Sequence, residues 1–208
     1  MKKIAILLVC ATVLALLLGC TGCGEQKAAE RLSDSGIDAL RTEYLLISES
    51  QMQLDYAMFD LETRLEIIPI LAEIEVLQAL PDYTVTVTHT ISETETYTEE
   101  LLFHQFEVKL HDVWINRTGA ELPETLVICF ADIFASSYPE LDVHDHAVVS
   151  LSESRGSHTG KYHFSDETAY YMTDTGYLLS FYEERGTRLS GLSKNAFESR
   201  ITGLLSVK

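Results

Sequence analysis

The triplet His144-Asp145-His146 is the feature of this sequence best suited to chemistry. On a strand, alternate side chains share one face, so its two imidazoles could bind Zn²⁺ or Cu²⁺ together with a third ligand. His158 or His163 could supply that ligand. We favour the alternative, a polar turn with solvated histidines, because no second motif fixes a ligand distance. A metal-binding protein or a hydrolase that uses His144, His146 and nearby acids is therefore our second hypothesis for function.

Other catalytic patterns are missing from the sequence. The pair Ser136-Ser137 lacks the Gly-x-Ser-x-Gly elbow of a nucleophilic hydrolase. Cys129 lies in the apolar run 126–130, where a cysteine behaves as a small buried hydrophobe. Paired carboxylates are expected on the solvated faces of so acidic a chain. The sequence therefore gives us no catalytic residue, no cofactor and no metal ligand to assign.

The elements that position these residues begin with a helical segment. Apolar side chains recur at three- and four-residue steps through residues 37–65, as in an amphipathic helix. The segment is one long helix, or two pieces of which the second, 61–68, is capped by Asp60. Pro69 ends it, because the residue before a proline avoids helical geometry. We expect the apolar stripe to pack on the protein's own core.

From residue 70 the apolar period changes to two, which indicates strands. The predicted strands are 70–77, 84–91, 97–98, 101–115, 126–130, 147–151, 161–164, 169–172 and 177–182. Pro81-Asp82 predicts a turn between the first two. Ser193 is expected to cap a last helix. Turn signals about every ten residues, without helix–strand alternation, indicate a small antiparallel barrel or sandwich.

The second half of the chain is rich in aromatic residues. Its rings are Tyr162, Phe164, Tyr170, Tyr171, Tyr177, Phe181 and Tyr182. A small barrel can use such rings as a stacking platform for sugars or bases. We favour packing in the core and across strands, because aromatic residues are good strand formers.

Charge restricts the partners of the chain. It has 15 basic and 32 acidic residues, a formal net charge of −17. Phosphate backbones repel such a chain, so we expect no nucleic-acid partner. Anionic lipid head groups repel it as well, so we expect no direct adhesion of the body to an anionic membrane.

The N-terminus carries a different kind of chemistry. Lys2 and Lys3 precede an apolar run, 4–18, which is shorter than the roughly 20 residues of a membrane-spanning helix. The run ends in Leu17-Leu18-Gly19-Cys20. These four residues resemble the lipobox of bacterial lipoprotein precursors. The resemblance implies cleavage before Cys20 and a diacylglyceryl group on its thiol, a strong nucleophile.

The lipobox resemblance, with the small polar residues that follow it, indicates a domain organisation. The chain divides into a signal peptide, 1–19, a flexible tether, 20–36, and one globular domain, 37–208. Removal of the signal peptide leaves 13 basic and 32 acidic residues, a net charge of −19. Acyl chains on Cys20, at ~0.8 kcal/mol per buried methylene, would hold this body at the cell membrane, outside the cytoplasm. A bridge between Cys23 and Cys129 stays open, because spacing alone does not establish disulfide geometry.

A second resemblance concerns the body. Residues 106–114 (FEVKLHDVW), the apolar strand 126–130 and the turn and strand at 141–149 resemble motifs of small OB-like barrels in bacterial surface lipoproteins. In the turn, His144 occupies the position of the usual glycine. The similarity covers about residues 66–204.

The resemblance implies a mainly β, α+β fold, with a small antiparallel OB-like barrel over 70–182. A helical segment at 37–68 would precede the barrel, and a short helix at 193–204 would close the domain. No activity is implied. Our leading hypothesis is therefore a non-enzymatic binding or structural module, held on the membrane by Cys20, whose further partner is a cell-envelope protein or polysaccharide.

Overall fold

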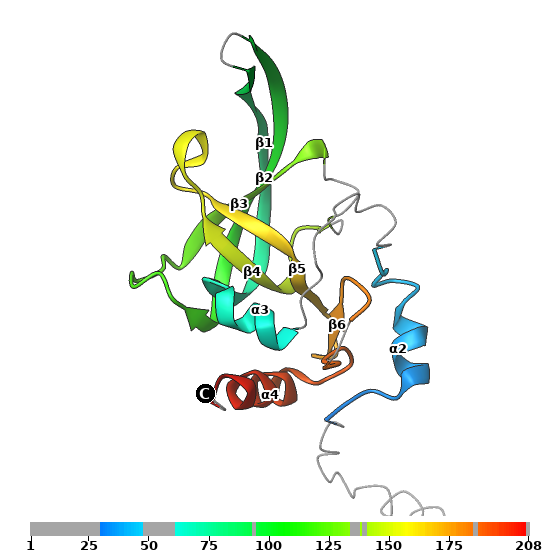
Figure 1. The fold of residues 1–208 in the computed structure, drawn as a ribbon. Helices are drawn as coiled ribbons and strands as arrows, with labels where there is room; N and C mark the ends of the chain where they lie inside the picture. The colour runs from blue at the N-terminus through cyan, green and yellow to red at the C-terminus, as the bar shows by residue number, and fades with distance from the viewer. Residues whose placement is uncertain are drawn as a thin grey trace, which may run out of the picture.

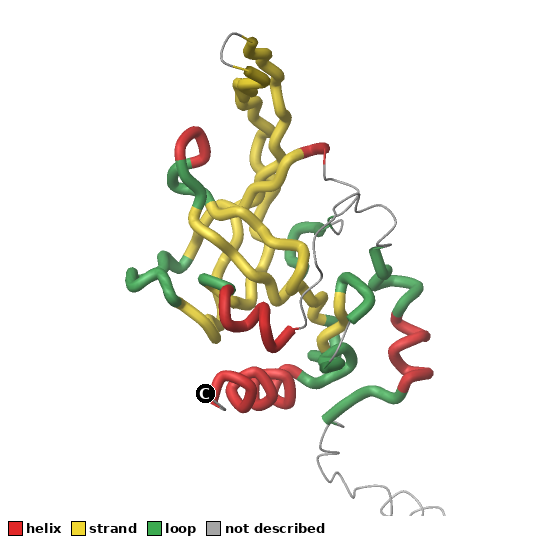
Figure 2. Tube along the Cα trace, viewed as in Figure 1, coloured by secondary structure: helices red, strands yellow, loops and turns green. Residues whose placement is uncertain are grey.

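The computed structural model describes residues 30–47, 61–92, 95–133, 138, 141–184 and 187–206. The expected signal peptide, Cys20 and most of the expected tether lie outside these ranges. Within them the fold is mainly β, with short helices at both ends of the described chain (Figures 1 and 2). The helices described here are all too short or too polar to cross a membrane.

The strands form a single mixed sheet. They are β1 (Ile70–Ser92), β2 (Glu95–Asn116), β3 (Thr125–Ala131), β4 (His146–Glu153), β5 (Tyr162–Met172) and β6 (Leu178–Ser180). Their order is β3-β2-β1-β4-β5-β6, and β3 also pairs with β5, so that five strands close into a ring. The β3–β5 pairing is parallel, whereas the others are antiparallel. The expectation of a wholly antiparallel sheet is wrong here, because an odd number of strands in a ring requires at least one parallel pair.

The turn predicted at Pro81-Asp82 is also wrong, because β1 continues through it. The β1–β2 register shifts between Leu80 and Tyr83, which places Pro81 and Asp82 in an irregularity of the ladder. A proline has no N–H to give to a ladder and is tolerated at such a bulge or on a strand edge. β4 pairs with β1 only up to Glu75, so Pro81 lies on an edge.

Most other predicted strands are present, in longer pieces. Predicted strands 97–98 and 101–115 are both parts of β2, and 161–164 and 169–172 are both parts of β5. β3 and β4 confirm the strands predicted at 126–130 and 147–151. The last predicted strand, 177–182, is reduced to the three residues of β6.

The helices are α2 (Asp34–Leu40), α3 (Leu61–Ile67) and α4 (Lys194–Ser206), with a short 3₁₀ helix, η3 (Gly156–His158). α2 lies partly inside the expected tether, and the Leu32 N–H already donates to the Gly191 carbonyl, so the chain joins the body before residue 37. α3 agrees with the two-piece prediction and ends before Pro69, whereas residues 48–60, including Asp60, lie outside the described chain. Ser193 Oγ accepts from the Ala196 N–H and caps α4 as expected.

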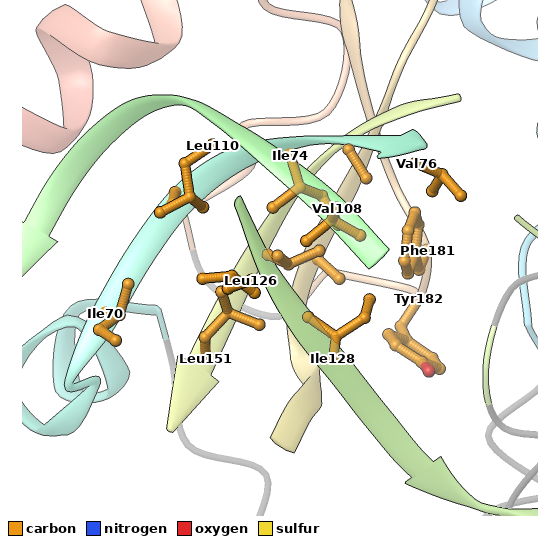
Figure 3. Packing of buried hydrophobic residues seen from close by; sticks show 14 residues of the cluster. Ile70, Ile74, Val76, Val108, Leu110, Leu126, Ile128, Leu151, Phe181 and Tyr182 are labelled. Carbon is orange, nitrogen blue, oxygen red and sulfur yellow. The ribbon is translucent and has the colours of Figure 1, made fainter. Parts of the chain in front are cut away.

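The interior of the ring is one of two apolar cores. Ile70, Ile74, Val108 and Leu151 are almost fully buried in it, and Figure 3 shows these side chains among those converging from different strands. Full burial of such a side chain contributes about 1.5–3 kcal/mol. Phe181 and Tyr182, which follow β6, also pack in this core.

The second core lies on the outer face of the ring, under the helices. Leu65 of α3 and Phe197 of α4 pack there with Leu71 of β1 and Val148 of β4 (Figure 1). Because side chains alternate along a strand, the residues between the ring-facing positions of β1 face outward, as Leu71 does. Glu73 and Glu75 therefore belong to this outer face, beyond the helix-covered core.

Candidate functional site

Polar side chains gather on the outer face where β4, β1 and β2 lie side by side. Glu75 of β1 is the register partner of His146, the first residue of β4. Glu73 lies two residues earlier on the same face of β1, opposite Val148. The ladder between β1 and β4 therefore places His146 beside two carboxylates.

A β-bulge brings the third strand into the site. Ala72 pairs with Val113 and Ile74 pairs with Leu110, so that Glu73 alone stands opposite two residues of β2, His111 and Asp112. Such a bulge bends the strand and re-aims its side chains. Here His111 reaches the Glu75 carboxylate, and Asp112 shares the Lys194 ammonium with Glu73.

We call Glu75, His111 and His146 the three-strand cluster. His111 Nε2 lies 2.9 Å from Glu75 Oε2, and His146 Nε2 lies 4.0 Å from the same oxygen. The two imidazole rings are 5.0 Å apart between centroids. Each residue offers one ligand atom within 4.8 Å of the other two. Two imidazoles and one carboxylate, each from a different strand, thus converge on one point.

Glu73 orients His146 from behind. His146 Nδ1 lies 3.2 Å from Glu73 Oε1, and an ionised carboxylate can only accept, so Nδ1 carries the proton. Nε2 of His146 is then left with a free lone pair toward Glu75. Lys194 Nζ in turn lies 2.5 Å from Glu73 Oε2 and 2.5 Å from Asp112 Oδ2. Glu73, whose side chain is only 4% exposed, is therefore fixed on both oxygens.

His144 approaches the other side of Glu75. Its Nδ1 lies 3.3 Å from Glu75 Oε1, and its side chain is 79% exposed. The backbone φ of His144 is 77°, and no other non-glycine residue of the described chain has a positive φ. A left-handed backbone costs a residue other than glycine roughly 1–2 kcal/mol. A histidine therefore occupies a position where glycine would be more stable.

Electrostatics favour a cation at this place. Hydrogen bonds from His111 and His144 hold the pKa of the Glu75 carboxyl below its ordinary value. Burial works to lower the pKa of Lys194, but Asp112 and Glu73 outweigh it and raise that pKa. With the histidines neutral, the carboxylates of Glu73, Glu75 and Asp112 and the one ammonium carry a formal charge of −2. A divalent cation would neutralise it.

The ligand set narrows the kind of cation. Imidazole nitrogens with a carboxylate suit zinc and neighbouring transition metals, whereas calcium and magnesium prefer oxygen ligands throughout. An imidazole that ligates a metal commonly donates its other N–H to a carboxylate, as His146 does to Glu73. The arrangement can therefore hold a zinc-like ion through three protein ligands and leave a further position open.

The sequence identified only part of this arrangement. His146 is in the cluster, and His144 reaches it through Glu75. His158 and His163, considered as possible third ligands, lie elsewhere, with their rings 5.3 Å apart and His163 beside Cys129. Residues Glu75 and His111 were missed. Their outward position follows from the period-two pattern, but their meeting depends on the bulge.

Other residues singled out from the sequence have structural positions or lie outside the described chain. Cys129 is buried, as expected, and is a free thiol, whereas Cys23 and Ser136-Ser137 are not among the described residues. The described aromatic side chains of the second half pack in or against the two cores: Tyr162, Tyr170, Tyr171, Tyr177, Phe181 and Tyr182 are buried or half-buried. This agrees with core packing and removes the support for a stacking platform.

A cavity of about 330 Å³ lies apart from the cluster. It is lined by α2, by Leu46 and by the chain around β6, with Arg41 half-buried in its wall. Arg41 donates to the carbonyl oxygens of Tyr44 and Ser180 and to Ser190 Oγ, so its guanidinium ties these segments together. None of the residues of the three-strand cluster lines it.

Comparison with known proteins gives no guide to this site, because no protein-family model and no curated protein matches the chain.

Proposed function

We propose that this chain is a lipid-anchored extracytoplasmic protein whose β body binds one zinc-like divalent ion through Glu75, His111 and His146. The observation that carries the metal proposal is the convergence of three ligand atoms, from three strands, within 4.8 Å of one another. The orientation of His146 by the buried Glu73 supports it, because the tautomer that Glu73 selects leaves Nε2 free for a metal.

We propose binding rather than turnover as the role of the cluster. A metal-dependent enzyme needs a concave substrate site at the ion. The cavity described above is lined by other residues. The three-strand cluster also lies on a rigid sheet, which suits an ion site whose ligand distances must be held closely.

The anchor proposal rests on the sequence. Lys2 and Lys3, the apolar run 4–18 and Leu17-Leu18-Gly19-Cys20 follow the order of a lipoprotein precursor. With its net charge of −17, the chain would be repelled by anionic lipid, so the acyl chains on Cys20 would carry the attachment. The further partner that we propose for the body is another component of the cell envelope.

We further propose that the ring is an OB-like barrel. A closed ring of five strands, with a helix at each end of the domain, supports this assignment. His144 supports it too, because its positive φ lies where the resembling lipoproteins have glycine.

Zinc titration of the chelator-stripped full chain in detergent tests the metal proposal. Isothermal calorimetry should give one ion per chain, because the three ligand atoms form a single cluster. The double variant His111→Ala, His146→Ala should lose this binding. Absence of stoichiometric binding by the wild type, or unchanged binding by the double variant, contradicts the proposal.

The matched control is a histidine–carboxylate pair elsewhere on the same two strands. His89 Nε2 lies 2.7 Å from Glu99 Oε1, and both side chains are exposed. His89→Ala removes a histidine of the same kind, and zinc binding should stay unchanged. Equal losses from His89→Ala and from the double variant would indicate unspecific binding to an acidic surface.

Phase separation tests the anchor. The wild type should enter the detergent phase of a cell lysate, and Cys20→Ala should move to the aqueous phase or stay in the uncleaved form. If acyl groups are found by mass spectrometry at another residue and Cys20→Ala stays fully lipidated, the assignment of Cys20 is wrong.

A further inference from the structure

The thiol of Cys129 lies beside a histidine at the place where the ring closes. The parallel β3–β5 pairing consists of two residue pairs, Ile128 with Tyr162 and Cys129 with His163. Cys129 Sγ lies 3.9 Å from His163 Nδ1. Closure of the ring therefore places a nucleophilic sulfur next to a base from a distant part of the chain.

The surroundings of this sulfur are polar. Ser154 is 4% exposed, and its hydroxyl has no hydrogen-bond partner among the described residues. The hydroxyls of Ser154 and Tyr83 both lie close enough to the thiol to affect its protonation. A cysteine that only filled space would not need such neighbours.

Cys129 and His163 each shift the pKa of the other. Burial alone would raise the pKa of the Cys129 thiol, but His163, Tyr83 and Ser154 outweigh it and lower that pKa. The thiol in turn raises the pKa of His163, although burial opposes this. Both directions favour transfer of the proton from sulfur to imidazole. A thiolate beside an imidazolium is therefore more accessible here than for the same two groups in water.

A second layer keeps the positive charge on His163. Burial, His163 and Lys161 together lower the pKa of His158, so His158 is the neutral member of the two histidines. Its Nδ1 lies 2.7 Å from Tyr83 Oη, and burial and Cys129 raise the pKa of Tyr83, so the Tyr83 hydroxyl keeps its hydrogen. A neutral His158 that carries its hydrogen on Nδ1 donates to this oxygen, which leaves the Tyr83 hydrogen for the sulfur. The Lys161 ammonium lies 3.1 Å from the centre of the Tyr83 ring and holds that ring in place.

Access limits the reactant to a small molecule. Cys129 has no exposed surface, whereas His158, His163 and Tyr83, which surround it, are only partly buried. Its sulfur therefore becomes reachable only when these side chains move apart, which admits a small reagent before a peptide or an aromatic disulfide. Hydrogen peroxide fits this limit, and thiolates attack it directly.

We propose that Cys129 is a peroxide-reactive thiol for which His163 is the proton donor. The thiolate sulfur attacks one peroxide oxygen and the O–O bond breaks. The leaving hydroxide takes the proton of the His163 imidazolium and departs as water. Sulfur is oxidised to a sulfenic acid by two electrons, peroxide is reduced, and His163 is left neutral. The sulfenic acid has no second thiol beside it in the described chain, where Cys129 is the only cysteine.

Peptide-resolved trapping tests this proposal. The reduced full chain is treated with hydrogen peroxide at pH 7, quenched with dimedone, and the Cys129 peptide is quantified by mass spectrometry. An adduct should form on Cys129, while 4,4′-dithiodipyridine should leave the folded protein unlabelled there. His163→Gln should slow the adduct by about ten-fold or more, because an ordinary thiol is only a few per cent thiolate at pH 7.

Two further variants keep the test decisive. Tyr83→Phe and Ser154→Ala each remove one hydroxyl near the sulfur, and each should slow the reaction even if His163→Gln does not fold. His104→Gln removes a histidine of another site and should not. A folded wild type that forms no Cys129 adduct, or a folded His163→Gln that reacts as fast as the wild type, overturns the proposal.

Discussion

The β1–β2 ribbon carries a histidine–glutamate pair in each of its two halves, and the pairs differ in what surrounds them. His111 Nε2 lies 2.9 Å from Glu75 Oε2 on the outer face of the ring, and His89 Nε2 lies 2.7 Å from Glu99 Oε1 on the projecting arm, residues 83–92 and 95–103 (Figure 1). β4 pairs with β1 along the first half of the ribbon, from Ile70 to Glu75. This third strand adds His146, so the same two-residue contact becomes a three-ligand cluster only where β4 lies beside the ribbon.

Burial follows the same division. The first residues of β1 are buried on both faces, whereas on the arm half-buried and exposed residues alternate. An exposed ion pair such as that of His89 contributes about 1 kcal/mol or less. The comparison indicates that the arm's pair is a surface contact, and that the ring supplies the rigidity that a metal site needs.

The largest effect should come from the apolar side chains of the two halves. Ile74→Ala should destabilise the fold by about 2–5 kcal/mol, because it leaves a cavity in the ring core. Val87→Ala, on the arm, should cost about 1 kcal/mol or less, because its side chain stays partly in water. Urea unfolding measures both. Equal losses would show that the arm shares the stability of the ring.

A smaller effect is expected from the residue behind the cluster. Glu73→Gln should weaken zinc binding about 10–100-fold, because the amide no longer fixes the tautomer of His146 as a carboxylate does. Glu99→Gln, the matched change on the arm, should leave zinc affinity unchanged. Calorimetric titration of the two variants decides this. If both variants lost zinc affinity, or if neither did, the ring and the arm would not differ in the way we propose.

Replacing His144 should have two effects, one on the stability of the fold and one on the pKa of Glu75. His144→Gly should stabilise the fold by about 0.5–1 kcal/mol, because glycine adopts a positive φ without strain. It should also let the pKa of Glu75 rise toward its ordinary value, since one of its hydrogen bonds is lost. Thermal unfolding and carboxyl NMR titration measure the two effects. A less stable variant would show that the contact with Glu75 outweighs the backbone strain.

Histidine titration gives the smallest test, at the point where the arm leaves the ring. The hydrogen bond to Asp132 raises the pKa of His104. Burial lowers this pKa, but the contact with Asp82 raises it further, so the net shift is upward. His104 should therefore titrate above about 6.5, and His158 below it. The ion pairs of His104 stabilise the fold fully below about pH 6.5, and this contribution is lost as pH rises through the raised pKa. In NMR titration, Asp132→Asn should lower the pKa of His104; no change would contradict the pairing.

Local patterns predicted the elements well, because alternation and capping are read from neighbouring residues. The period-two pattern from Ile70, the end of α3 before Pro69 and the Ser193 cap all agree with the structure. The turn at Pro81-Asp82 failed, because an edge bulge can accept a proline as easily as a turn can.

The two proposed sites, the three-strand cluster and the Cys129–His163 pair, depend on strand pairings between residues that are far apart in the sequence. His111 meets Glu75 through a bulge between β1 and β2, and His163 meets Cys129 through the parallel closure of the ring. Neither register follows from composition or spacing. His146 could be singled out because it shares a short motif with His144, whereas its partners on β1 and β2 belong to no such motif.

The most direct test of the metal site is anomalous diffraction at the zinc edge from crystals of the zinc-loaded protein. The proposal predicts one strong peak about 2.0–2.2 Å from a nitrogen of His111, a nitrogen of His146 and an oxygen of Glu75. The pair His89 and Glu99 should show no comparable peak. A peak at the arm, or none at the three-strand cluster in protein that holds one zinc per chain, would contradict the proposal.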